Sequence, residues 1–124
     1  MKQVLLVFFG GGLGSVLRYL VSRPLNDFFH NFFLGTFVVN IIGCLLIGLI
    51  LGLSAKVNLL SFNTTLFLAT GFCGGFTTFS AFAFEKHTLL KNGDLLNLSL
   101  YTIASLVIGV LAVALGIWLS KLGE

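Results

Sequence analysis

The chain has 124 residues, of which 57% are hydrophobic and only 9% are charged. Soluble domains usually carry about 25% charged residues, so this composition excludes an ordinary soluble domain and indicates an integral membrane protein. The formal net charge of +3 is spread thinly along the chain, which gives no support for nucleic-acid binding.

Four apolar segments are long enough to cross a lipid bilayer as helices. They cover residues 4–21, 32–53, 64–84 and 98–119, and the short segments between them hold nearly all the charges. A helix of about 22 residues rises roughly 33 Å, against a hydrocarbon core of about 30 Å. We therefore predict one all-α transmembrane domain over residues 1–124, with both termini on the same side of the membrane.

The connecting segments leave no room for a nucleotide-binding or catalytic domain. Cys44 and Cys73 fall inside spans, and we interpret them as small apolar packing residues. His30 and His87 lie in connecting segments, where we interpret them as interfacial polar groups. Because no metal-ligand spacing appears and no nucleophile and base assemble a site, we do not expect an enzyme.

The third span contains a sequence that disfavours a continuous helix. Its middle places Gly74 and Gly75 side by side and follows them with Thr77 and Thr78. In hydrocarbon, a weakened helical backbone is stable only where it is buried in protein or lines a polar cavity. We therefore predict a helix broken mid-span at a transport site, where the carbonyls freed at Gly74 and Thr77 are candidate ligands for a cation.

Aromatic rings recur every three residues beside this predicted break, at Phe76, Phe79 and Phe82, with the hydroxyl of Ser80 between them. The edge of a phenyl ring is positive, so rings turned edge-on can receive a small anion without trapping it. The alternative is that these rings face lipid or pack in the core.

Other spans offer further polar candidates. Asn40 shares a helix face with Thr36 near the middle of the second span, so it either makes an interhelical hydrogen bond or presents a donor to a passing anion. In the fourth span, Tyr101, Ser105 and Gly109 form a weakly polar stripe that fits either core packing or conduction.

Charges near the span ends carry two predictions. Arg18, three residues before the end of the first span, either snorkels to the interface or attracts anions to a vestibule. Glu85 follows the third span, where we expect it to face water or to cap that vestibule, so that no acidic residue lies inside a span. A proton-coupled cation exporter generally needs an intramembrane carboxylate, and this absence argues against one.

Orientation is weakly specified, because basic residues nearly balance across the membrane. Three lie on the side of the termini and four on the other side, namely Lys2, Lys56 and Lys121 against Arg18, Arg23, Lys86 and Lys91. We therefore predict insertion in both orientations and pairing of inverted copies. Glycines at four-residue spacing, at Gly10 and Gly14, Gly48 and Gly52, and Gly71 and Gly75, favour such pairing.

Four segments together carry a family resemblance. They are residues 11–19 (GGLGSVLRY), residues 35–40 (GTFVVN), residues 71–82 (GFCGGFTTFSAF) and the spaced polar residues from Tyr101 onward. With its four-span plan, essentially the whole chain resembles the CrcB/Fluc family of small fluoride channels. The chain departs from the family pattern at Ser15, Ala81 and Gly109, and the last two lack a hydroxyl that some members carry.

The resemblance implies an antiparallel, dual-topology homodimer in the cell inner (plasma) membrane. Such a protein lets cytoplasmic fluoride leave the cell passively through narrow pathways, and holds a structural sodium ion at the dimer centre. By resemblance, the backbone carbonyls of Gly74 and Thr77 from both copies hold this sodium. Two alternatives are a small proton-coupled drug exporter and a non-conducting membrane subunit.

The resemblance also implies roles for seven side chains. Phe79 and Phe82 are similar to the paired aromatic positions of the fluoride pathway, with Asn40 as a hydrogen-bond donor beside them. The polar positions of the family correspond to Ser80, Tyr101 and Ser105 along the pathway and to Arg18 at the vestibule.

Overall fold

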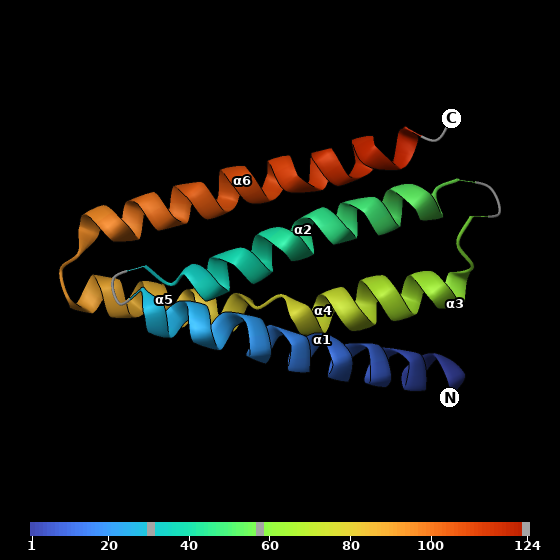
Figure 1. The fold of residues 1–124 in the computed structure, drawn as a ribbon, viewed down its shortest axis with the longest axis horizontal. Coiled ribbons are helices and arrows are strands. Elements are labelled where there is room, and N and C mark those ends of the chain that lie inside the picture. Colours follow the sequence, from blue (N-terminus) through green and yellow to red (C-terminus); the bar gives the residue numbers. More distant parts are fainter. Residues whose placement is uncertain (30–31, 57–58, 123–124) are drawn as a thin grey trace.

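A computed structural model describes residues 1–29, 32–56 and 59–122, and the described residues contain helices and no strand (Figure 1). His30 lies outside them. In chain order the helices are α1 (Lys2–Phe28), α2 (Leu34–Ser54), α3 (Phe62–Thr65), the π-helix η1 (Leu66–Cys73), α4 (Gly74–Phe76), α5 (Phe79–Lys91) and α6 (Leu95–Lys121).

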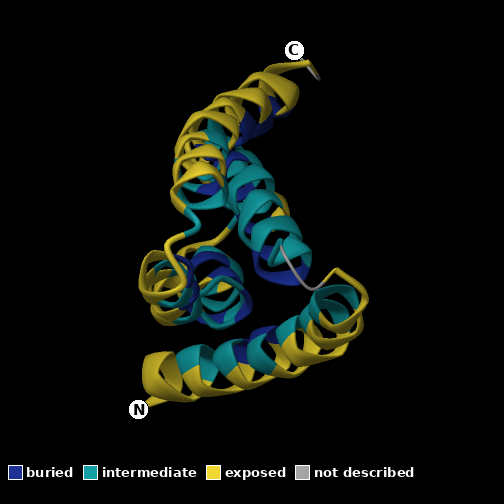
Figure 2. Ribbon diagram, turned by 90° about the vertical axis from the view of Figure 1, so that its left-hand side faces the viewer, coloured by how far each residue is buried: buried dark blue, intermediate teal, exposed yellow. Residues whose placement is uncertain are grey.

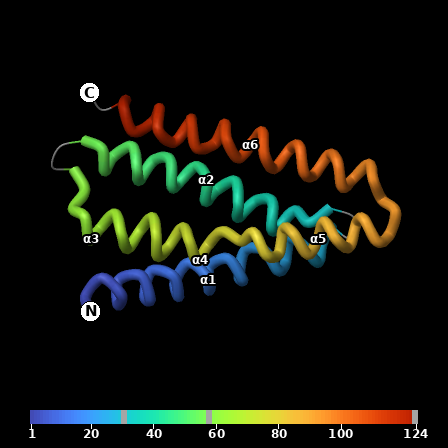
Figure 3. Tube along the Cα trace, turned by 180° about the vertical axis from the view of Figure 1, so that it is seen from behind, coloured from blue at the N-terminus to red at the C-terminus, as the bar shows by residue number. Residues whose placement is uncertain are grey.

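Four helical segments within the described residues are long and apolar enough to cross a membrane. They are Lys2–Phe28, Leu34–Ser54, Phe62–Lys91, which contains α3, η1, α4 and α5, and Leu95–Lys121. This confirms the predicted all-α membrane fold with four spans. The start of α1 and the end of α6 lie at the same end of the molecule, as four crossings require (Figures 1 and 3).

Side chains fix where several helices begin. The side chains of Ser61, Thr78 and Asp94 cap α3, α5 and α6 by accepting a bond from a backbone N–H in the first turn. The N-cap of α2 provides no such bond, and Asn26 of α1 replaces it, because its Oδ1 accepts the Gly35 N–H at 2.7 Å. Gly93 has a φ of +72° in the turn before α6, a conformation that favours glycine.

Close helix packing within the chain depends on small residues. A Cβ added to Gly14 of α1 would overlap the Phe72 carbonyl oxygen of the third span, and one added to Gly116 of α6 would overlap the Leu45 carbonyl oxygen of α2. The spaced glycines that we predicted to favour pairing between copies, from Gly10 to Gly75, instead bring α1 against the third span and α2 against α6. The sequence pattern has the same form whether the neighbouring helix belongs to the same chain or to another.

The interior is small, as expected for a chain whose outer face meets lipid. Much of the outer surface of α1 and α6 is exposed, whereas the buried residues lie on the sides that face other helices (Figure 2). One buried cluster joins Ile50 of α2 to Ala69 and Cys73 of η1. Cys73 is 2% exposed and unbridged, in agreement with the packing role that we predicted.

Candidate functional site

The third span is broken in its middle, as the sequence predicts. Thr77 and Thr78 both adopt extended backbone conformations, with φ and ψ of −87° and 158° at Thr77 and −147° and 122° at Thr78. The helix resumes at Phe79, where the Thr78 hydroxyl accepts the Ala81 N–H at 3.2 Å. The eight residues of η1, immediately before α4, form a π-helix, so the span departs from α-helical geometry on both sides of α4.

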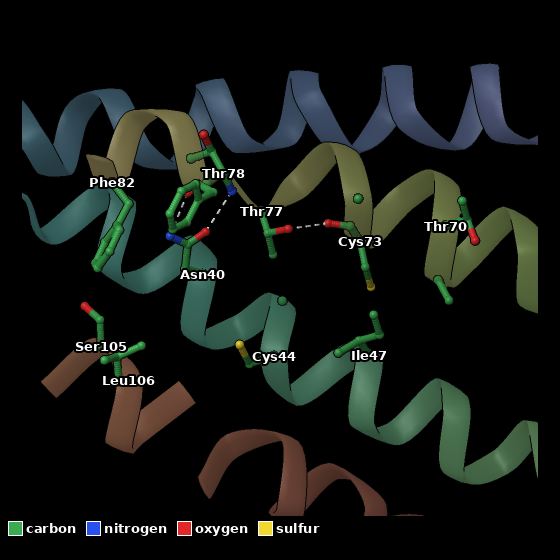
Figure 4. A pocket seen from close by; sticks show the side chains of 14 residues that line it. Asn40, Cys44, Ile47, Thr70, Cys73, Thr77, Thr78, Phe82, Ser105 and Leu106 are labelled. Atoms are coloured by element: carbon green, nitrogen blue, oxygen red, sulfur yellow. Dashed lines mark hydrogen bonds between the residues drawn. The ribbon is translucent and has the colours of Figure 1, made fainter. Parts of the chain in front are cut away.

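Asn40 of α2 holds the broken segment by a pair of hydrogen bonds. Its Oδ1 accepts the Thr78 N–H at 2.8 Å, and its Nδ2 donates to the Thr78 carbonyl oxygen at 3.1 Å (Figure 4). This is the interhelical hydrogen bond that we weighed for Asn40. Nδ2 carries two N–H groups, and the second donates to no described residue, so it is free to donate to an anion.

The break leaves two backbone carbonyls without their helical donors. In an unbroken α-helix the Thr78 N–H would bond the Gly74 carbonyl, and the Ala81 N–H would bond that of Thr77. These N–H groups instead bond the Asn40 and Thr78 side chains. The Gly74 and Thr77 carbonyls are therefore available as oxygen ligands, which is the chemistry that a sodium ion needs.

A groove of about 470 Å³ lies beside the break and opens to one side of the chain. Gly74 is exposed there, and a Cβ added to it would meet nothing within 4 Å. In Figure 4, Asn40, Phe82 and Ser105 gather at one end of the groove, and Ile47 and Thr70 lie toward the other. The groove is lined by Asn40, Gly43, Cys44, Ile47, Ala69, Thr70, Cys73, Gly74, Thr77, Thr78, Phe79, Phe82, Ser105 and Leu106.

Six of the predicted site residues thus share this groove, namely Asn40, Gly74, Thr77, Phe79, Phe82 and Ser105. The Phe79 and Phe82 rings lie 6.0 Å apart between centroids, and the Phe79 side chain is 79% exposed. The Ser105 hydroxyl is buried without a hydrogen-bond partner among the described residues. Aromatic edges and an unused hydroxyl are groups that attract a small anion.

The other predicted residues lie outside the groove lining. Ser80 is exposed, and its hydroxyl lies 3.2 Å from that of Thr78. Tyr101 is fully buried behind Phe82, with 5.4 Å between ring centroids.

Arg18 is half-buried, and its Nε has no partner among the described residues. It lies ten residues before the end of α1, because this helix continues beyond the predicted span to Phe28. Gly109 is buried near Cys44 between α6 and α2.

Glu85 corrects one expectation, because its carboxyl group does not face water. The third span continues to Lys91, so this carboxylate lies inside the span, where it is 5% exposed. The Thr36 hydroxyl donates to its Oε1 and the Tyr101 hydroxyl to its Oε2, the latter at 2.9 Å. We predicted that the third span ends just before Glu85, because Glu85 is its first charged residue. Its burial is possible because the two hydroxyls replace the hydrogen bonds that water would make to the carboxylate. The argument against an exporter from a missing intramembrane carboxylate therefore fails.

Asn26 extends this polar group to the first helix. Its Nδ2 donates to the Thr36 hydroxyl at 3.5 Å, while its Oδ1 caps α2. The chain of bonds from Asn26 through Thr36 and Glu85 to Tyr101 joins all four spans. Sequence reasoning missed Asn26, although an asparagine eight residues before a helix start that lacks its own capping side chain was a usable signal.

Comparison with known proteins identifies the family. The model of the family described as "CrcB-like protein, Camphor Resistance (CrcB)" matches residues 5–117. The chain belongs to the CrcB family. A "Fluoride-specific ion channel FluC" of Gloeothece citriformis is 52% identical to it over 99% of this chain and all of the relative. Proteins with the same name from Phocaeicola vulgatus and Prosthecochloris aestuarii are each 48% identical, over 98% and 97% of this chain and 100% and 94% of the relatives. The resemblance seen in the sequence motifs is thereby confirmed.

The Asn40 hydrogen bonds generate a stability prediction for this CrcB protein. We expect Asn40→Ala to lower the free energy of unfolding by about 1–3 kcal/mol, because the Thr78 N–H and carbonyl each lose a bond away from water. Thermal or denaturant unfolding in detergent measures the change. Ser99→Ala, at an exposed position of α6, is the control and should unfold like the wild type. Equal stability of the two variants would show that Asn40 does not hold the break.

Proposed function

We propose that this protein is a passive fluoride channel of the cell membrane, which lets cytoplasmic fluoride leave the cell and so lowers its toxicity. The observation that carries the proposal is the groove at the broken third span, where Phe79, Phe82 and Ser105 gather beside Asn40. Relatives of about 50% identity over the whole chain are named as fluoride-specific ion channels. The role is that of a channel and not of an enzyme.

The residues of the groove suit a small, strongly hydrated anion. Fluoride enters a pore only if donors replace much of its water, and it leaves only if each site holds it weakly. The second N–H of Asn40, the Ser105 hydroxyl and the positive edges of Phe79 and Phe82 are donors of this weak kind. We assign the polar continuation of the pathway to Ser80 and Tyr101 and the vestibule to Arg18.

An antiparallel homodimer accounts for features that one chain leaves incomplete. The groove is open on one side, and a Cβ added to Gly74 would meet no atom of the described residues within 4 Å. The basic residues of the sequence divide three against four between the two sides, which is close to a balance. Such a balance favours insertion in both orientations, and an inverted copy would close both grooves against the lipid.

A sodium ion at the dimer centre fits the donor set. Gly74 and Thr77 each supply a backbone carbonyl that has lost its helical donor, and an inverted copy would supply the same pair. Four carbonyl oxygens suit a hard monovalent cation, as the unwound helices of other membrane proteins illustrate. The sodium would hold the two broken spans together and would not be transported.

Glu85 is the feature that supports the alternative of a proton-coupled exporter. A buried carboxylate inside a span is the group that a proton-coupled exporter uses to alternate between proton and substrate. Exporter activity would appear as saturable, proton-dependent flux of an organic cation. A non-conducting subunit would show no flux when reconstituted alone.

The first prediction here tests the channel itself. We expect liposomes containing the purified protein to release fluoride rapidly, without release of chloride in a matched assay. Phe82→Ile should cut the fluoride flux at least about tenfold, because it removes the aromatic edge, while the assembled protein keeps its size in detergent. A fluoride electrode measures the flux. Absence of fluoride release from correctly assembled wild-type protein would refute the channel, and wild-type flux in the variant would remove Phe82 from the pathway.

The second prediction concerns sodium. Complete replacement of sodium by N-methylglucamine at constant ionic strength should lower both the dimer fraction in detergent and the fluoride flux. The carbonyls of the two copies would then lack the ion that they bind together. Sodium added back should restore both quantities. If the dimer fraction and the flux are the same in the two cations, no sodium is needed.

A further inference from the structure

Lys86 is a basic residue whose side-chain nitrogen is buried inside the protein. It follows Phe82 by one helical turn on α5, so the two side chains share a face. Its Nζ is buried and makes no hydrogen bond to a described residue. A buried ammonium needs compensation from its surroundings, because removing a charge from water is costly.

Two aromatic rings provide that compensation. The Lys86 Nζ lies over the Tyr101 ring, 3.0 Å from its centroid, and over the Phe82 ring, 4.1 Å from its centroid. The negative face of an aromatic ring attracts a cation, most strongly where water is excluded. Phe32 packs against the same tyrosine, with 5.2 Å between centroids, so the ammonium lies beside a cluster of rings.

Glu85, the neighbouring residue, does not take this charge as a direct ion pair. Successive residues of a helix point in different directions, and the Glu85 carboxylate accepts bonds from Thr36 and Tyr101 instead. Its carboxyl group lies beside the aromatic cluster, because it bonds the Tyr101 hydroxyl, and in its ionised form it would repel an anion that reached Phe82. Lys86 brings one positive charge to the same place and offsets it.

The position of the ammonium also changes how strongly the rings attract an anion. A ring face is negative and repels an anion, so a ring lining an anion pathway is favourable only in some orientations. A cation held against one face of Phe82 attracts an anion arriving from any other side of that ring, and the low dielectric constant of the surroundings strengthens this effect. Phe82 lines the groove, whereas Lys86 does not, so the charge acts on the pathway without binding the anion directly.

We infer that Lys86 is a positioning residue of the fluoride pathway, which makes the aromatic site at Phe82 and Tyr101 attractive to an anion. The inference rests on the proposed channel function. Lys86 lies against the Phe82 and Tyr101 rings and supplies a positive charge that offsets Glu85, while Phe82 itself lines the groove.

The test compares variants of Lys86 in the liposome flux assay over a range of fluoride concentrations. Lys86→Met keeps the length of the side chain and removes the charge, and Lys86→Arg keeps the charge. At low fluoride we expect Lys86→Met to conduct about tenfold less than the wild type, equivalent to about 1.4 kcal/mol of lost anion stabilisation. The deficit should shrink at high fluoride, and Lys86→Arg should conduct within about twofold of the wild type, because the guanidinium also binds ring faces.

Lys91→Met is the matched control, because it removes the same charge from an exposed position near the end of the same helix. Its flux per assembled dimer should equal that of the wild type. Melting temperature and dimer fraction separate a packing role, which would lower both in Lys86→Met and Lys86→Arg alike, from the role inferred here. If Lys86→Met does not assemble, Lys86→Gln replaces it as the uncharged variant.

Two results would overturn the inference. One is wild-type flux at low fluoride in an assembled uncharged variant, and the other is an equal loss of flux in the uncharged variant and Lys86→Arg. Absence of fluoride flux from the wild-type protein and from Lys91→Met would instead refute the channel function on which the inference rests.

Discussion

The fold depends on one polar contact in an apolar setting, the pair of hydrogen bonds between the Asn40 amide and the Thr78 peptide. A backbone that leaves helical geometry inside a membrane must find other partners for its polar groups. Asn40 satisfies Thr78 and, by taking its N–H, releases the Gly74 carbonyl. The same local break therefore lets a new helix, α5, begin at Phe79, and it brings Gly74, Thr77 and two aromatic residues to one groove.

A second polar group, nearer the end of the molecule away from the termini, fixes the helices around this break. Asn26, Thr36, Glu85 and Tyr101 bond in series and draw one side chain from each span. Small residues then allow the helix backbones to approach closely, as at Gly14 and Gly116. The lipid supplies no hydrophobic force between helices, so polar bonds and close packing hold the chain together, and the charges of Glu85 and Lys86 are held inside it.

Much of this was predictable from sequence where the signal is local. The run of Gly74, Gly75, Thr77 and Thr78 disfavours a helix whatever surrounds it, so the break was predicted correctly. Glu85 was misplaced because hydropathy ends a span at the first charge, whereas its burial depends on hydroxyls that lie 49 and 16 residues away along the chain. The glycine spacings were ambiguous for a related reason, since they show that a helix approaches closely but not which one.

The central claim is that the groove of one chain is closed by an inverted second copy, and membrane orientation tests it most directly. With Cys44 and Cys73 replaced by alanine, single reporters Ala55→Cys and Asn92→Cys lie at exposed sites at opposite ends of the molecule. A membrane-impermeant maleimide added to intact spheroplasts should label about half of the copies of each variant, since both orientations coexist. Nearly complete labelling of one reporter and almost none of the other would contradict the account.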